Sequence, residues 1–217
     1  MKKKHPIEAL IEQGEHQQLD FKFEVSDSKK IARTLSAFAN TDGGRLLIGV
    51  KDNGNISGVR SEEEYYIEAA SKMYTRPEVP FEATRWEING KTVLEIYIAP
   101  SLEKPHLAPD KENKYKAYIR VADENILANE ILMLAWEKKH MKDGTLVKIS
   151  KPVERLFAYL DQHPSINVGQ FCRVGHVNYY TARNILSDLL AIDALQYVVI
   201  DKRILYERVP GNDKLAL

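Results

Sequence analysis

Three carboxylates in the N-terminal quarter of the chain have residue types and positions suited to metal-dependent chemistry. Glu15 and Asp20 precede a Phe-Lys pair, and Asp52 follows the apolar run 46–50. If a sheet pairs these segments, the three carboxylates converge into a candidate Mg²⁺ or Mn²⁺ site. Such ions activate water and stabilise the leaving oxygen in phosphodiester cleavage, so all three are candidate metal ligands and catalytic residues. The alternative is structural: Asp52 shapes a turn, and Glu15 pairs with Lys22 or caps a helix.

A second group of polar residues opens a predicted helix near the C-terminus. In helix–turn–helix proteins the second helix enters the major groove, and its first residues contact bases. Asn178 can bind adenine, Arg183 can bind guanine and Tyr179 can hold a phosphate. Lys202 and Arg203 fall at the tip of a following hairpin, where contact with the DNA backbone or minor groove is expected. The alternative is that this part of the chain binds another protein.

The segments that must position the carboxylates alternate between helix and strand. Ile31, Leu35 and Phe38 recur with helical spacing and predict a helix over 26–40. Gly43-Gly44 follows it, either to end the helix and start a strand or to bring backbone amides to an anion; the first is favoured. The remaining predicted elements are a strand at 46–50, a partner strand at 56–59, a helix over 61–73, a hairpin over 86–99, a strand at 114–121 and a helix over 129–139.

The C-terminal segments follow the order of a winged helix. Apolar spacing predicts three helices and then two strands, at 153–160, 168–172, 178–191, 195–200 and 204–209. The polar, basic stretch 141–151 is the predicted linker, because it holds a glycine and leads into a proline. The expected domains are therefore 1–140, an α+β domain with a mixed sheet and flanking helices, and 152–217, a small winged helix–turn–helix domain.

Composition excludes several classes of protein. The chain has 217 residues, of which 44% are hydrophobic, enough for a folded core. Its 31 basic and 31 acidic residues give no net charge, so any nucleic-acid site must be a local patch. The single cysteine, Cys172, and the scattered histidines argue against disulfides and zinc. With no apolar run long enough for a membrane span and no signal peptide, we expect a cytoplasmic protein without a membrane partner.

Four motifs taken together resemble the Schlafen AlbA_2 domain over about residues 10–125. They are Glu15-x4-Asp20-Phe21-Lys22, the run Ala-Phe-Ala-Asn-Thr-Asp-Gly-Gly at 37–44, Ile-Gly-Val-x-Asp-x-Gly at 48–54, and Tyr-Ile-Arg-Val at 118–121. The resemblance implies a nucleic-acid-binding module of prokaryotic regulators and vertebrate Schlafens, often followed by a winged helix. It also implies that acids at these positions cleave RNA with a metal in some vertebrate members, although Asp20 replaces the commoner Glu. The zinc ligands of the vertebrate domain are missing from this sequence.

These observations lead to one main functional hypothesis and two alternatives. The main hypothesis is a DNA-binding transcriptional regulator, which favours DNA over RNA as its partner. Vertebrate Schlafens place two such lobes around a basic groove, so the resemblance implies a homodimer here. The alternatives are a metal-dependent nuclease and a protein-interaction adaptor. Besides the C-terminal residues, the candidate nucleic-acid-binding cations of the first domain are Lys22, Lys29, Lys114, Lys116 and Arg120.

Overall fold

A computed structural model describes residues 5–59, 62–141 and 144–210. The chain divides into two compact units, Met1–Ala128 and Asn129–Leu217. This division lies before the linker predicted at 141–151, because helix α4 (Glu130–Lys139) packs against α7 (Tyr179–Ala191) of the second unit. The predicted linker itself leads directly into α5 (Lys151–Leu160), and residues 142–143 lie outside the described part.

The N-terminal unit is built on a four-stranded mixed sheet with the order β1-β2-β4-β3. Strand β1 (Leu19–Lys22) runs parallel to β2 (Gly44–Ile48), whereas β4 (Lys91–Ile98) pairs antiparallel with both β2 and β3 (Glu82–Ile88). The predicted hairpin is therefore present, with Asn89-Gly90 at its turn. The predicted strand at 56–59 is not, since Ile56 makes only an isolated bridge with Val50.

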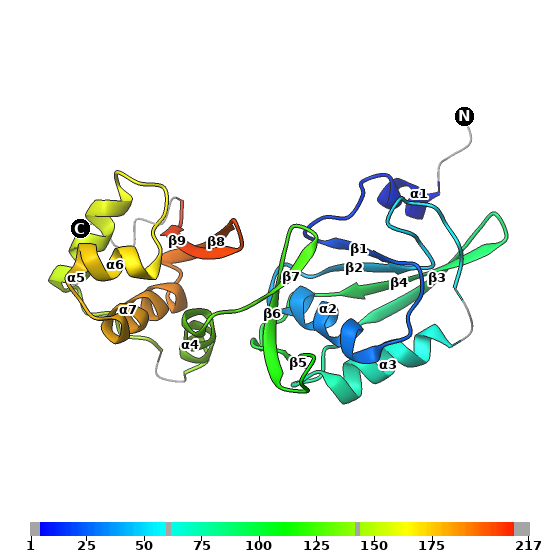
Figure 1. The fold of residues 1–217 in the computed structure, drawn as a ribbon, viewed down its shortest axis with the longest axis horizontal. Coiled ribbons are helices and arrows are strands. Elements are labelled where there is room, and N and C mark those ends of the chain that lie inside the picture. The colour runs from blue at the N-terminus through cyan, green and yellow to red at the C-terminus, as the bar shows by residue number, and fades with distance from the viewer. Residues whose placement is uncertain (1–4, 60–61, 142–143, 211–217) are drawn as a thin grey trace. The chain divides into compact units, whose positions relative to one another are not determined.

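Helices cover both faces of this sheet (Figure 1). Side chains alternate across the pleat of β2, so Leu46 and Ile48 pack with α2 (Ser28–Asn40) and α3 (Glu63–Tyr74). Leu47 points to the opposite face and joins the core beneath α1 (Pro6–Ile11). Helix α3 starts two residues later than predicted, and residue 61, where the predicted helix begins, lies outside the described residues.

Helix α2 also packs on a second, three-stranded antiparallel sheet, formed by β5 (Leu107–Pro109), β6 (Tyr115–Val121) and β7 (Glu124–Leu127). The buried side chain of Asn40 joins the helix to this sheet. Its Nδ2 donates to the carbonyls of His106 (2.8 Å) and Tyr118 (2.9 Å), and its Oδ1 accepts from the His106 amide (2.8 Å). The asparagine of the 37–44 motif thus satisfies three buried backbone groups that would otherwise destabilise the fold.

The glycine pair of the same motif makes the change from helix to strand possible. Gly43 has a φ of +70°, and a Cβ there would lie 2.6 Å from the Ile98 carbonyl oxygen. A Cβ on Gly44 would lie 2.5 Å from the Phe38 ring. The Gly43 amide donates to the Phe38 carbonyl at 3.0 Å. This amide therefore closes the helix, as the favoured interpretation of the pair expected.

The C-terminal unit contains four helices and a hairpin among its described residues. After α4 and α5 come α6 (Val168–Gly175), α7, and the antiparallel pair β8 (Leu195–Ile200) and β9 (Arg203–Arg208). Ile166 bridges to Tyr206 of β9, which adds a short third segment to the hairpin. In the part of the chain that the structure describes, no helix is long and apolar enough to cross a membrane.

Candidate functional site

A buried ion pair lies where the two sheets of the N-terminal unit approach each other. Arg120 Nη2 on β6 donates to Asp20 Oδ1 on β1 at 3.0 Å, and their side chains are 2% and 5% exposed. Arg120 is one of the cations predicted to bind nucleic acid, but α2 covers its face of β6, so the residue is buried. Arg120 Nη1 also donates to Asn125 Oδ1 at 3.1 Å, and Lys22 Nζ lies 2.6 Å from Asp20 Oδ2.

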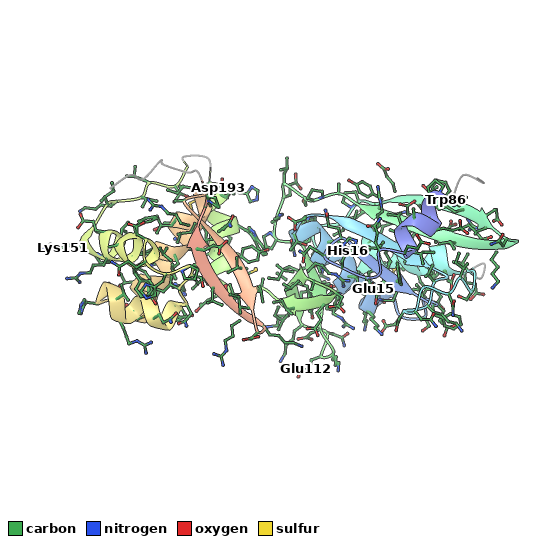
Figure 2. The ribbon with its side chains drawn as sticks, turned by 90° about the horizontal axis from the view of Figure 1, so that it is seen from above. Glu15, His16, Trp86, Glu112, Lys151 and Asp193 are labelled. Atoms are coloured by element: carbon green, nitrogen blue, oxygen red, sulfur yellow. The ribbon has the colours of Figure 1, made fainter. Side chains whose placement is uncertain are left out.

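Glu15 adds a second carboxylate next to this ion pair. It lies in the segment before β1, beside His16 (Figure 2), and its Oε1 accepts from the Phe21 amide at 2.8 Å. Partial burial raises the pKa of Glu15 above its ordinary value. The negative charge of Asp20 and a hydrogen bond between the two side chains raise it further. Glu15 and Asp20 are therefore neighbours, as their shared motif predicted.

The third predicted carboxylate does not join them. Asp52 is exposed in a turn after β2, and no group of three or more His, Cys, Asp or Glu side chains placed to hold a metal occurs among the described residues. Both Asp20 oxygens are already engaged by cations, and one Glu15 oxygen is engaged by a backbone amide. The arrangement thus does not fit the predicted Mg²⁺ or Mn²⁺ site, and the expected convergence of Glu15, Asp20 and Asp52 is wrong.

An open pocket of about 370 Å³ lies over the ion pair. Thr34, Tyr118 and Asn125 contribute neutral walls, and three carboxylates line it: Asp20, Asp110 and Asp123. Five cations exceed these three acids and give the pocket a positive balance. The cations come from β1, α2, the turn before β6 and β6 itself; they are Lys22, Lys30, Arg33, Lys111 and Arg120.

The pocket contains two of the five sequence-predicted cations of this unit, Lys22 and Arg120. The other three do not line it: Lys29 Nζ bonds Asn113 Oδ1 at 2.6 Å, Lys114 pairs with Glu112 at 2.7 Å, and Lys116 is exposed on β6. Lys30, Arg33 and Lys111 also line the pocket but were not among the predicted cations. The i, i+3 spacing of Lys30 and Arg33 on α2 was the available signal, since it places both on one side of the helix.

The polar residues predicted at the start of α7 have partners inside their own unit. Asn178 is the N-cap, and its Oδ1 accepts from the Thr181 amide at 2.9 Å. The Tyr179 hydroxyl donates to one carboxylate oxygen of Glu130 on α4, and Arg183 Nη1 donates to the other at 3.1 Å. Asn178 therefore caps the helix, and Tyr179 and Arg183 have a carboxylate partner that their sequence pattern did not predict.

Two further parts of this surface are open. Tyr180 is 65% exposed, and the Arg183 guanidinium lies 4.5 Å from the centre of its ring. Lys202 lies in the turn between β8 and β9, Arg203 begins β9, and both residues are exposed at the hairpin tip. An exposed aromatic ring and a basic tip are features that nucleic-acid interfaces use.

Comparison with known proteins identifies the family. The Schlafen AlbA_2 family matches residues 15–129, more than half of the chain, and the chain belongs to that family. The matched residues contain the mixed sheet and its flanking helices, so this part of the chain is the Schlafen AlbA_2 domain that the motifs predicted. The comparison with curated proteins found no match.

Two solved structures are similar to parts of this chain. The DIP2311 protein of Corynebacterium diphtheriae is 21% identical with a TM-score of 0.47, and the match covers 67% of this chain and 32% of that one. The N-terminal domain of a protein related to the ATP-dependent DNA helicase RecG, from Nitrosomonas europaea, is 20% identical with a TM-score of 0.36; the match covers 58% and 97%. The chain thus spans 32% of the length of the first of these proteins.

The contrast between Asp20 and Asp52 yields a stability prediction. Asp20→Ala leaves the Arg120 charge buried without its main partner, so we expect a loss of about 3–5 kcal/mol. Asp52→Ala removes an exposed side chain, so we expect a change within about 0.5 kcal/mol. Urea unfolding followed by Trp86 fluorescence, with Trp136→Phe in every variant to silence the second unit, measures both. Equal losses in the two variants would contradict the assigned structural role of Asp20.

The raised pKa of Glu15 yields a pH prediction. The folded state holds the Glu15 proton more tightly than the unfolded state does. Protonation of Glu15 therefore contributes fully to the free energy of unfolding below its ordinary pKa of 4.5, and this contribution is lost as pH rises through the folded-state pKa. Glu15→Gln cannot ionise and keeps an acceptor for the Phe21 amide. The variant should therefore lose less stability than the wild type between pH 4.5 and neutrality. Parallel pH profiles of the unfolding midpoint would show that the carboxylate is not under strain from burial and Asp20.

Proposed function

We propose that this protein binds nucleic acid and acts as a DNA-binding transcriptional regulator. The observation that carries the proposal is the pocket over the Asp20–Arg120 pair, where five cations gather in a chain that has no net charge. Such a local concentration of Lys and Arg suits phosphate groups, because a bound polyanion releases condensed counterions as its phosphates are neutralised.

The cations of the pocket differ in how freely they can meet a phosphate. Arg120 and Lys22 are held by Asp20, and Arg33 donates to the Pro109 carbonyl at 3.0 Å. Lys30 and Lys111 are exposed at the rim. We therefore assign the phosphate contacts chiefly to the rim, with the buried pair fixing the strands on which the rim is built.

The C-terminal unit is proposed to be a winged helix that contacts duplex DNA. The order of α5, α6, α7 and the β8–β9 hairpin supports this assignment, as does the bridge from Ile166 to Tyr206. The exposed Tyr180 and the hairpin tip with Lys202 and Arg203 supply the contact surface. A homodimer would present two such units to a palindromic site, and we keep it as part of the proposal.

The alternatives have weaker support. The nuclease hypothesis required three convergent carboxylates, and the described residues do not form such a group. The adaptor hypothesis gains from the engagement of Tyr179 and Arg183 by Glu130, but it leaves the basic pocket of the N-terminal unit without a role.

The proposal predicts a salt-dependent loss of affinity when the rim is neutralised. Lys30→Gln with Lys111→Gln should weaken binding and lower the slope of log affinity against log salt by about two, because two phosphate contacts are lost. Fluorescence anisotropy of the full chain with labelled duplex DNA and labelled single-stranded DNA, over a range of salt concentrations, measures both quantities.

The matched control removes two lysines of the same unit that do not line the pocket, Lys72 and Lys91. This control pair should leave the slope close to that of the wild type. Equal slopes for the pocket pair and the control pair would remove the pocket from the interface. Absence of nucleic-acid binding by the wild-type chain at low salt would overturn the proposed function and favour the adaptor hypothesis.

A further inference from the structure

The carboxylate of Glu130 binds two side chains from the first turns of α7, those of Tyr179 and Arg183. Glu130 is in the first turn of α4, and its two oxygens take the Tyr179 hydroxyl and Arg183 Nη1. Helix α4 runs beside α7 beyond this point, since Lys138 Nζ near its end contacts Ser187 Oγ at 2.8 Å and Asp188 Oδ1 at 2.6 Å. Polar contacts therefore join the two helices at both ends of α4.

The contacts of Glu130 imitate those of a phosphate. Arg guanidinium and Tyr hydroxyl groups are donors that bind phosphate oxygens in nucleic-acid complexes, and a carboxylate offers two oxygens to the same donors. Glu130 is anionic at neutral pH, and its bonds to Tyr179 and then Arg183 lower its pKa further. A phosphate approaching these donors would therefore meet a negative charge already bound to them.

The Glu130 contacts are also accessible to a competitor. The Glu130 side chain is 49% exposed and that of Arg183 is 21% exposed. Ion pairs at such positions contribute little to stability because solvent screens them. The lysine at the other end of α4 is different, since it is only 17% exposed and has several partners in α7. The start of α7 can thus exchange partners while the end of α4 stays in place.

We propose that Glu130 is an internal competitor of nucleic-acid phosphate at the start of α7 and sets the affinity of this surface. This inference rests on the proposed function, and it specifies how that function is regulated within the C-terminal unit. Binding of a phosphate to Arg183 and Tyr179 requires the carboxylate to leave them. Removal of its charge therefore strengthens binding without creating any new contact residue.

The test is Glu130→Gln in the full chain, with the same labelled duplex DNA. The amide keeps an oxygen acceptor but loses the charge, so affinity should rise about two- to fivefold. The salt slope should steepen by about one, because Arg183 becomes available for one more phosphate. Glu137→Gln removes an exposed charge from the same helix and is the matched control; it should change neither quantity appreciably.

A double-mutant cycle separates competition from a change in folding. Arg183→Gln made in the wild type and in Glu130→Gln should abolish the gain, since the freed donor is then absent. Thermal midpoints of all variants check that the unit stays folded. Unchanged or weaker binding by Glu130→Gln overturns the inference, as does an equal gain in Glu137→Gln or a gain that survives Arg183→Gln. The proposed function is tested by separate measurements: the salt slope of Lys30→Gln with Lys111→Gln, and nucleic-acid binding by the wild-type chain at low salt.

Discussion

The buried pair of Asp20 and Arg120 is the interaction on which the N-terminal unit depends. Two charges taken out of water are costly, and they are tolerated here because further partners surround them: Lys22 beside Asp20, and Asn125 beside Arg120. The pair links β1 of the mixed sheet to β6 of the smaller sheet, and α2 packs against β6 beside it. Its position fixes the strands and the helix from which the pocket cations project. The acid that the motif suggested as a metal ligand is therefore explained as the anchor of a cationic surface.

The same chemistry occurs in the C-terminal unit at a weaker strength. Glu130 and Arg183 form an exposed pair, whereas Asp20 and Arg120 form a buried one, and this difference in burial separates a structural contact from an exchangeable one. In both units a carboxylate forms an ion pair with an arginine that was predicted to bind nucleic acid. A carboxylate and a phosphate compete for the same donors, so sequence patterns alone cannot tell a satisfied arginine from one that is available to a ligand.

The sequence predicted most helices and strands because their apolar spacing is regular and their end signals are strong. Leu46, Leu47 and Ile48 indicated a strand covered on both faces, and Asn89-Gly90 indicated a hairpin. The site was harder to predict, since it depends on contacts between residues about 100 positions apart. Arg120 was expected to bind nucleic acid, and only the packing of α2 on β6 shows that it is buried. Lys111 gave no signal, because it lies in a turn whose place near α2 is set by the tertiary fold.

The most direct test of the account is to locate the nucleic acid on the protein. In an NMR titration of the isotope-labelled full chain with DNA, changes in backbone shifts should gather at Lys22, Lys30, Lys111 and the start of α7, and they should fade as salt rises. Changes confined to surfaces away from both the pocket and α7, or changes that do not respond to salt, would contradict the claim that these cations hold phosphate.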